Sequence, residues 1–284
     1  MMKSIAARPP SLLLWLSMVL AAVLGPMSAQ AKERVLIIGG AGHSGSAVAK
    51  MLIARGDAVT AFVRPTTDRS PLDGLPVDFV VGDAMKANEV AAVLQDKDFT
   101  VMFETVQVFP GSEASYSRMY ENFVPWAKRM KVKQFISIGG GCGDNARDDC
   151  PLSPPLFALS GDMNRSEHIL RNSGVPYTII RVGALIPSNP FHPDANKASG
   201  TSYLTTDRTK FGGVLRVDLN QQIVACIGAE RCLNKTFIID DPAIKPQFDH
   251  WICKRANEGP VVSGDNPICG EMPSVTADQL TRTP

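Results

Sequence analysis

Short apolar runs alternate with amphipathic segments from residue 35 to residue 239 of the 284-residue chain. The runs are three to five residues long and rich in Val, Ile and Phe, which is typical of strands buried on both faces. They lie at residues 35–38, 59–63, 79–81, 101–103, 135–138, 177–181 and 236–239. A regular exchange of strands and helices predicts an α/β fold, a doubly wound parallel sheet with helices on both faces.

Helical spacing occurs in the segments between these runs. The predicted helices cover residues 44–55, 88–94, 159–172 and 218–227. The first ends at Arg55-Gly56, a basic last turn followed by a glycine stop. Another segment carries a stripe of large side chains at helical spacing, namely Tyr116, Met119, Tyr120, Phe123 and Trp126. We interpret this stripe as a face that packs on the core and not as a cofactor-binding sequence.

The regular pattern weakens toward the C-terminus. Residues 185–212 contain three prolines and two glycines without periodicity, and the segment after Asp240 is rich in proline. Long irregular stretches in compact domains are usually functional loops over a site, or they are disordered. We expect residues 185–212 and 241–284 to form an irregular C-terminal region, a cover on the substrate side and a surface tail.

The first 31 residues form a separate segment. Lys3 and Arg8 precede an apolar run from Leu12 to Leu24, and Ala29-Gln30-Ala31 resembles a cleavage site. This order is typical of a secretory signal peptide, and the run is shorter than the ~20 residues that a membrane-spanning helix needs. We predict cleavage after Ala31 and export to the periplasm or the exterior. An uncleaved anchor is the alternative.

Cleavage would leave residues 32–284, enough for one large α/β domain. This part has 27 basic and 28 acidic residues and no block of five or six like charges. Such a balance argues against a nucleic-acid surface or an anionic-membrane surface. We therefore expect a small-molecule substrate, no nucleic acid and no membrane association after cleavage. The sequence does not define the oligomeric state.

All six cysteines follow the predicted signal peptide. An even number in an exported chain indicates disulfides, and sequence proximity favours Cys142–Cys150, Cys226–Cys232 and Cys253–Cys269 among the possible pairings. Six unpaired, buried cysteines are the alternative. The chain has no Cys-x-x-Cys motif and its four histidines lack metal-ligand spacing, so we predict no metal.

A glycine-spaced turn follows the first strand directly. In Gly39-Gly40-Ala41-Gly42-His43-Ser44-Gly45 the spaced glycines suit a tight turn, close approach of a phosphate, and close packing of the next helix. The first N–H groups of that helix and its dipole favour an anion. We therefore predict a Rossmann-type dinucleotide site. Its predicted pyrophosphate-side residues are Gly39, Ala41, Gly42, His43, Ser44 and Gly45.

Four further positions lie at the carboxyl ends of predicted strands, where ligands of such sheets bind. Arg64 stands where NAD-binding proteins carry an acid, and a guanidinium pairs well with a 2′-phosphate, so NADP is favoured over NAD. Arg64 could instead lie solvated at the sheet edge. Asp83 could bind the adenine amino group or cap the next helix. Thr105 and Ser137 follow at the same edge.

These motifs resemble the short-chain dehydrogenase/reductase superfamily, in particular its atypical, NmrA-like NAD(P)-binding branch. The resemblance spans most of residues 34–240 and includes Gly39–Gly45, Phe62-Val63-Arg64, Val81-Gly82-Asp83-Ala84, Asn122, Phe135-Ile136-Ser137, Glu167, Ser173–Thr178 and Arg216-Val217-Asp218. It implies that Arg64 binds the 2′-phosphate and that Asp83 and Ala84 lie at the adenine. It also implies that Arg181 and Gly183 lie near the nicotinamide.

One departure from that family concerns catalysis. Its catalytic members carry Tyr-x-x-x-Lys, in which the lysine lowers the tyrosine pKa for proton transfer. Aligned on Glu167, these positions hold Leu159 and Met163, and the motif occurs nowhere else in the chain. Ser137 matches the family's catalytic serine and is our candidate catalytic residue. Tyr116, Tyr120, Tyr203 and His192 are candidate substitutes for the missing acid, each also explained as structural or solvated.

Two functions remain open from the sequence. The first is an exported NADP-dependent oxidoreductase that acts on a small carbonyl, quinone or similar acceptor. The second is a non-catalytic NAD(P)-binding sensor or scaffold that has lost the Tyr/Lys pair. A hydrolase is disfavoured, because Gly42-His43-Ser44-Gly45-Ser46 only approximates the Gly-x-Ser-x-Gly nucleophile elbow.

Overall fold

The computed structural model describes residues 32–109, 112–140, 154–186, 197–207, 210 and 213–244. The described residues from Glu33 to Ile244 belong to one compact unit. Several predictions fall outside the described residues: the signal peptide, the tail after residue 244, His192, and the pairs Cys142–Cys150 and Cys253–Cys269. These stay predictions, as does the proposed division into domains.

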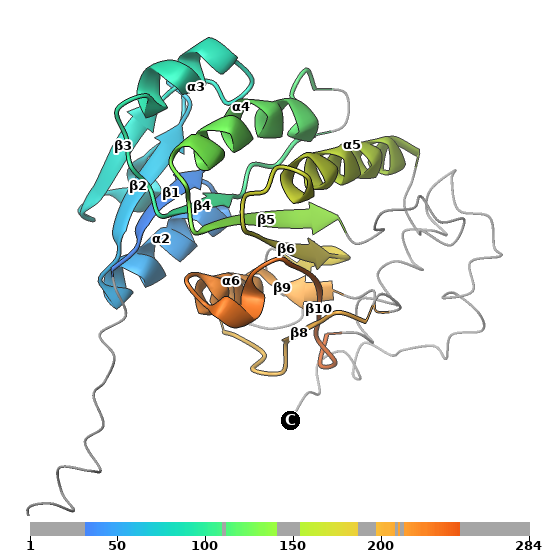
Figure 1. The fold of residues 1–284 in the computed structure, drawn as a ribbon. Helices are drawn as coiled ribbons and strands as arrows, with labels where there is room; N and C mark the ends of the chain where they lie inside the picture. Colours follow the sequence, from blue (N-terminus) through green and yellow to red (C-terminus); the bar gives the residue numbers. More distant parts are fainter. Residues whose placement is uncertain are drawn as a thin grey trace, which may run out of the picture. The chain divides into compact units, whose positions relative to one another are not determined.

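Eight strands form one sheet in the order β3-β2-β1-β4-β5-β6-β10-β8. They are β1 (Arg34–Ile38), β2 (Ala58–Val63), β3 (Val77–Val81), β4 (Val101–Glu104), β5 (Gln134–Gly140), β6 (Tyr177–Val182), β10 (Lys235–Asp240) and β8 (Tyr203–Thr205). All neighbours are parallel except β10 and β8, which are antiparallel. The order reverses between β1 and β4, as in a doubly wound Rossmann-type sheet, so the predicted fold class is confirmed (Figure 1).

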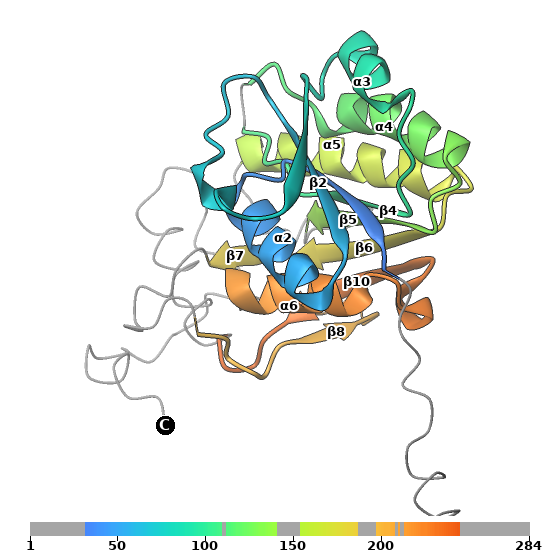
Figure 2. The same ribbon diagram turned by 90° about the vertical axis from the view of Figure 1, so that its left-hand side faces the viewer.

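Helices cover both faces of this sheet (Figures 1 and 2). They are α2 (His43–Arg55), α3 (Ala87–Leu94), α4 (Tyr116–Arg129), α5 (Pro154–Arg171) and α6 (Arg216–Cys226). Buried side chains of α3, α4 and α5 pack with one face of the sheet, and those of α2 and α6 pack with the other. Among the described residues, none of the helices is both long and apolar enough to cross a membrane.

Successive side chains of β1 pack alternately into the two cores, one on each face of the sheet. Leu36 and Ile38 belong to the core beneath α3, α4 and α5, whereas Val35 and Ile37 belong to the core beneath α2 and α6. Successive strand residues point to opposite faces, so a strand covered on both sides must be apolar at every position. Most of the stripe on α4 is buried as predicted, with Tyr120 1% exposed, and Trp126 is partly buried against the same core.

Two features complete the described C-terminal part. Three-residue strands form at β7 (Ala184–Ile186), β8 and β9 (Gly213–Leu215), which the sequence pattern did not predict because so few residues show no alternation. β7 and β9 pair in a separate parallel sheet. Cys226 at the end of α6 forms a disulfide with Cys232, as predicted, across a Cα–Cα distance of 5.5 Å.

Candidate functional site

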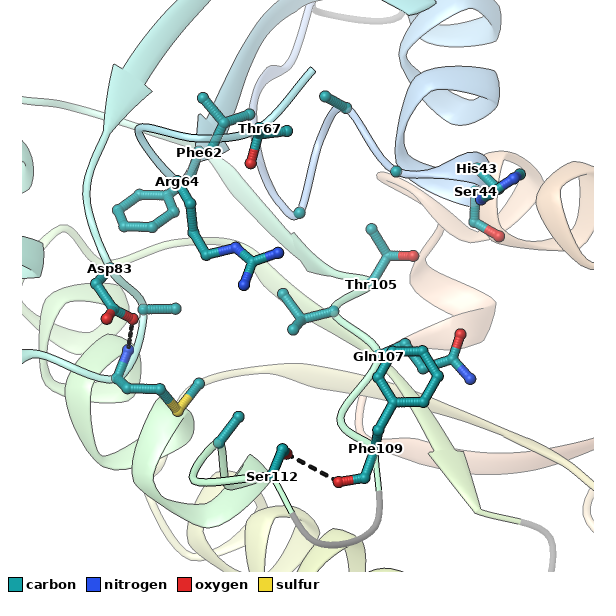
Figure 3. Close-up of a pocket in the computed structure, with 18 of the residues that line it drawn as sticks. His43, Ser44, Phe62, Arg64, Thr67, Asp83, Thr105, Gln107, Phe109 and Ser112 are labelled. Carbon is teal, nitrogen blue, oxygen red and sulfur yellow. Dashed lines mark hydrogen bonds between the residues drawn. The ribbon is translucent and has the colours of Figure 1, made fainter. Parts of the chain in front are cut away.

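A cavity of about 370 Å³ lies at the carboxyl ends of β1, β2, β3 and β4, beside the point where the strand order reverses (Figure 3). Ligands of open α/β sheets bind at this topological position. The cavity is lined by Gly39, Ala41, Gly42, His43, Ser44, Phe62, Val63, Arg64, Thr67, Asp83, Ala84, Met85, Thr105, Val106, Gln107, Phe109, Ser112, Ala114 and Arg216. It therefore gathers most of the predicted cofactor-binding residues.

The glycine turn has the geometry that its spacing predicts. Gly39 has φ +86°, a conformation that favours glycine, and its N–H donates to the Phe62 carbonyl at 3.0 Å. This bond holds the turn against the end of β2. Gly45 lies in the first turn of α2, where a side chain would collide with the carbonyl oxygen of Gly39 and the backbone of Gly40. Glycine at this position lets α2 pack closely on the turn.

The N-terminus of α2 is open toward an anion. Gly42 is its N-cap residue, no side chain caps the helix, and its first turn contains no acidic residue. The first N–H groups of a helix lack partners within the helix, and the helix dipole adds partial positive charge there. His43 and Ser44 line the cavity at this point. The arrangement fits a bound phosphate group.

A basic residue that is distant in the sequence also lies at the N-terminus of α2. Arg216 is the first residue of α6, lines the cavity, and donates from Nη1 to the Ser44 hydroxyl oxygen at 3.1 Å. Its Nε is buried without a hydrogen-bond partner in the described part of the chain. Burial lowers the pKa of this guanidinium. Arg216 belongs to the motif that the chain shares with the family, but its sequence position alone did not indicate a site residue.

Arg64 follows β2 and points into the cavity (Figure 3). Its side chain is exposed, and none of the residues that the structure describes forms an ion pair or hydrogen bond with its guanidinium. The turn after it is closed by the Thr67 N–H, which donates to the Arg64 carbonyl at 3.1 Å. The guanidinium is thus positioned at the cavity and available to a charged ligand.

Asp83 and Ala84 form the wall next to Arg64. Asp83 Oδ1 accepts a hydrogen bond from the Met85 N–H at 2.9 Å, so the carboxylate closes the turn before α3. Asn122 of α4 donates to the Ala84 carbonyl at 2.8 Å and fixes this wall to the neighbouring helix. Asp83 Oδ2 lies 3.9 Å from Lys86 Nζ. The prediction that Asp83 caps α3 is wrong, because the N-cap residue of this helix is Lys86 and no side chain caps it. The adenine contact stays a prediction.

A buried polar cluster lies under the wall formed by Thr105 and Val106. Glu104 Oε1 accepts from the Val106 N–H at 2.6 Å, and the Tyr120 hydroxyl lies 3.1 Å from Glu104 Oε2 and 2.5 Å from Ser137 Oγ. Glu104, Tyr120 and Ser137 are each 1% exposed. Burial raises the pKa of Glu104 to about 8, and it raises the pKa of Tyr120 well above its usual value.

Four predicted site residues do not line the described cavity, and the first of them is Gly45 in the first turn of α2. Ser137 belongs to the buried cluster, and Gly183 lies beyond the end of β6. Arg181 is buried, and its guanidinium contacts the Glu167 carboxylate at 2.6 Å, which ties β6 to α5. Gly139 makes room for this pair, because a side chain there would collide with Glu167 Oε1.

The position of the family's catalytic lysine is apolar. Met163 is partly buried and packs against the core beneath α3, α4 and α5. The side chain of Leu159, at the tyrosine position, is outside the described part of the structure. In the ranges that the structure covers, no group of three or more His, Cys, Asp or Glu side chains could hold a metal ion.

The fold and the cavity define an α/β protein with a dinucleotide-type site. The model of the NAD(P)H-binding family matches residues 39–230, so the chain belongs to this family. The match confirms the resemblance to the atypical short-chain dehydrogenases/reductases drawn from the sequence motifs.

Two curated relatives are similar in sequence. An uncharacterized chloroplastic protein of Arabidopsis thaliana is 28% identical over 179 residues, and this match covers about half of each chain (53%). Sanguinarine reductase of Eschscholzia californica is 26% identical over 263 residues, 76% of this chain and 90% of that protein. The chain is therefore an NAD(P)-binding, reductase-like protein.

Two solved structures share the fold. ChuY, an anaerobillin reductase from Escherichia coli O157:H7, is 22% identical with a TM-score of 0.60, and the match covers 75% of this chain and 99% of that one. A short-chain dehydrogenase/reductase from Veillonella parvula, solved in complex with NADP, is 16% identical with a TM-score of 0.58 and covers 75% and 96% of the two chains.

Proposed function

We propose that the protein is an exported NADP-dependent oxidoreductase that reduces a small carbonyl, quinone or similar acceptor. The observation that carries the choice of cofactor is Arg64, which points into the cavity from the end of β2. In the NAD-specific form of this fold an acid at that position accepts hydrogen bonds from the ribose hydroxyls. A guanidinium cannot accept them, but it pairs with a phosphate.

The rest of the cavity fits the other parts of the same cofactor. The turn at Gly39 and Gly42, the open N-terminus of α2 and the Arg216 guanidinium would hold the pyrophosphate. Asp83 and Ala84 would contact the adenine. When bound, the cofactor supplies a hydride, which transfers two electrons to the acceptor. The protein's own residues orient both molecules and exclude water.

An organic acceptor suits the remaining lining. Val106 and Phe109, in the segment that follows β4, add apolar surface to the cavity, and Phe109 is 63% exposed. A flat apolar molecule would gain burial by packing there. The names of the relatives, sanguinarine reductase and anaerobillin reductase, support reduction of a small organic molecule.

Binding and turnover are tested separately. Fluorescence titration of the purified protein with NADPH and NADH should give saturable binding with the lower Kd for NADPH. NADPH oxidation is then followed by absorbance with a panel of carbonyl and quinone acceptors. Saturable turnover that falls in Arg64→Ala supports the oxidoreductase. Failure to bind either nucleotide would refute the proposal.

A non-catalytic sensor or scaffold is the second candidate. The observation in its favour is Met163, an apolar side chain where catalytic family members carry lysine. A methionine cannot lower the pKa of a tyrosine or hold a proton. NADPH binding without oxidation above background by any acceptor would establish this candidate over the first.

The export proposal rests on the sequence of residues 1–31, and the Cys226–Cys232 disulfide supports it because disulfides persist in oxidising compartments. Fractionation of cells that express the full chain with a C-terminal tag, followed by N-terminal sequencing, provides the test. A soluble exported protein that begins at Lys32 is expected. Full-length protein in the membrane fraction would indicate the uncleaved anchor instead.

A further inference from the structure

The first turn of α6 contacts two different parts of the protein. Arg216, its first residue, lines the cavity and donates to the Ser44 hydroxyl oxygen at 3.1 Å. Asp218, two residues further on, is 1% exposed and does not line the described cavity. Residues two positions apart on a helix point in different directions, so this one turn carries its two charged side chains to different neighbours.

The Asp218 carboxylate holds residues 199–203, which we call the latch segment. The Ser199 N–H donates to Asp218 Oδ2 at 2.9 Å, and the Gly200 N–H donates to Oδ1 at 3.4 Å. The hydroxyl oxygens of Ser199 and Ser202 lie 3.2 and 3.5 Å from Oδ1 of the same carboxylate. Hydrogen bonds to a charged group are stronger than those between neutral groups. The buried carboxylate therefore anchors the latch segment on α6.

The latch segment has further anchors on α6 and after β10. Gln222 Nε2 donates to the Ser202 carbonyl at 3.0 Å, and the Thr201 hydroxyl donates to Asp241 Oδ1 at 2.6 Å. Three of its five residues are exposed, so the segment lies at the surface and is held from beneath. It belongs to the irregular stretch 185–212, which the sequence predicts as a cover on the substrate side.

The Arg216 guanidinium can form more hydrogen bonds than the described residues give it. Its Nε is buried and has no hydrogen-bond partner in the part of the chain that the structure describes. A buried donor without a partner costs free energy, which a phosphate oxygen would recover. At the other end of α6, Cys226 forms a disulfide and Arg55 of α2 donates to the Val224 carbonyl at 3.0 Å. Because that end is fixed, a ligand at Arg216 would act on the first turn of the helix.

We propose that cofactor binding at Arg216 stabilises the latch segment through the first turn of α6, with Asp218 as the positioning residue that connects the two. The inference rests on the proposed function, because it takes the NADP pyrophosphate as the ligand of Arg216. A more stable first turn holds the Asp218 carboxylate in place, and with it the backbone of Ser199 and Gly200. The cofactor would thereby fix this part of the cover before the acceptor binds. Such coupling is reciprocal, so a loosened latch segment must weaken cofactor binding.

Hydrogen exchange tests the coupling in one direction and needs no turnover. Mass spectrometry of peptides that contain residues 199–203 measures amide exchange with and without saturating NADPH. Exchange should slow by about fivefold or more on binding, which is the low end of typical couplings between sites. NADH should have the same effect, because it carries the same pyrophosphate. Equal exchange in the free and the saturated protein would overturn the proposal and leave the proposed function intact, whereas failure to bind either nucleotide would refute both.

Nucleotide titration tests the coupling in the other direction. Asp218→Asn should raise the Kd for NADPH and for NADH by roughly fivefold each. The sign of this change is informative, since the loss of a negative charge near Arg216 would by itself favour a phosphate. Ser199→Ala changes no charge, removes a hydroxyl contact with Asp218, and should give a smaller rise in both Kd values. Asp96→Asn, in the exposed turn after α3, is the matched control and should leave both Kd values unaltered.

These measurements separate coupling from a purely structural role of Asp218. A purely structural role would lower the melting temperature of Asp218→Asn, but it would change neither the Kd of the folded protein nor the response of exchange to nucleotide. Unchanged Kd values in both Asp218→Asn and Ser199→Ala would overturn the proposal. If Asp218→Asn does not fold, Ser199→Ala and the exchange experiment on the wild type decide.

Discussion

The Arg216 guanidinium donates a hydrogen bond to the Ser44 hydroxyl oxygen at 3.1 Å, although the two residues are 172 positions apart in the chain. Ser44 lies in the first turn of α2, and Arg216 is the first residue of α6. Both helices cover the same face of the sheet, so their N-terminal ends meet at the glycine turn. Two sources of positive charge, a helix N-terminus and a side chain, therefore converge on one point of the cavity.

Arg216→Ala should weaken NADPH and NADH to the same extent, because both carry the pyrophosphate. Loss of a hydrogen bond to a charged group costs ~1.5–3 kcal/mol, which corresponds to a rise in Kd of roughly 10- to 150-fold. Fluorescence titration with both nucleotides measures this. Arg118→Ala on the exposed surface of α4 is the control with the same charge change and should leave both Kd values unaltered. Selective weakening of NADPH alone would place the 2′-phosphate at Arg216.

Arg64→Ala, in contrast, should weaken the binding of NADPH but not of NADH. The Kd for NADPH should rise by about tenfold or more, since a charge-assisted contact with the 2′-phosphate is removed, whereas the Kd for NADH should stay near its wild-type value. The ratio of the two Kd values in wild type and variant is the readout. An unchanged ratio would mean that Arg64 lies solvated at the sheet edge.

The parts of the fold that depend on the local pattern of apolar residues and glycines could be predicted from the sequence. Strands such as β1 are covered on both faces, so they appear as unbroken apolar runs, and α2 ends where Gly56 adopts φ +95°. The glycine turn could be predicted for the same reason, because each glycine is needed to avoid a clash with residues close to it in the sequence. The edge strand β8 was not, since its three residues pair with β10 through tertiary contacts alone.

Other site residues could not be predicted, because their positions depend on contacts with residues that are distant in the sequence. Arg216 reaches the cavity only because α6 packs beside α2, and no local pattern encodes that. Glu104 did leave a signal, an acidic residue at the end of an otherwise apolar strand at the ligand-binding edge. Arg181 is placed by the resemblance near the nicotinamide, and its burial against Glu167 became visible only when β6 and α5 were in place.

Gly45→Ala tests the close packing of α2 on the glycine turn. The added methyl group would meet the Gly39 carbonyl oxygen and the Gly40 Cα, so the helix must shift, at a cost of ~1–3 kcal/mol. A lower melting temperature and weaker NADPH binding are expected. Gly161→Ala in α5 is the matched control, because nothing lies within 4 Å of its added Cβ and alanine favours helix by up to ~1 kcal/mol. Equal effects of the two substitutions would argue against the packing role of Gly45.

Arg181→Met separates a structural role from a cofactor contact. Removing one partner of a buried ion pair costs ~3–5 kcal/mol, so the free energy of unfolding should fall while the Kd of the folded protein for NADPH stays constant. Adding Glu167→Leu should recover part of the stability, since the second buried charge is then removed as well. Denaturant titration and nucleotide binding measure the two effects. A large rise in Kd would favour the position near the nicotinamide.

Glu104→Gln should change how stability depends on pH. Below pH 4.5 the carboxyl is protonated in both the folded and the unfolded chain, so the free energy of unfolding does not change with pH on its account. Between 4.5 and about 8 the unfolded chain releases the proton that the folded protein keeps, so the free energy of unfolding of the wild type falls as pH rises. Above about pH 8 both states are ionised and the loss is complete. Glutamine does not titrate, so the stability of the wild type relative to Glu104→Gln should decrease by on the order of 4 kcal/mol from about pH 5 to about pH 9. Denaturant titrations of both proteins at several pH values measure this difference, and a difference that does not vary with pH would show that Glu104 is ionised throughout.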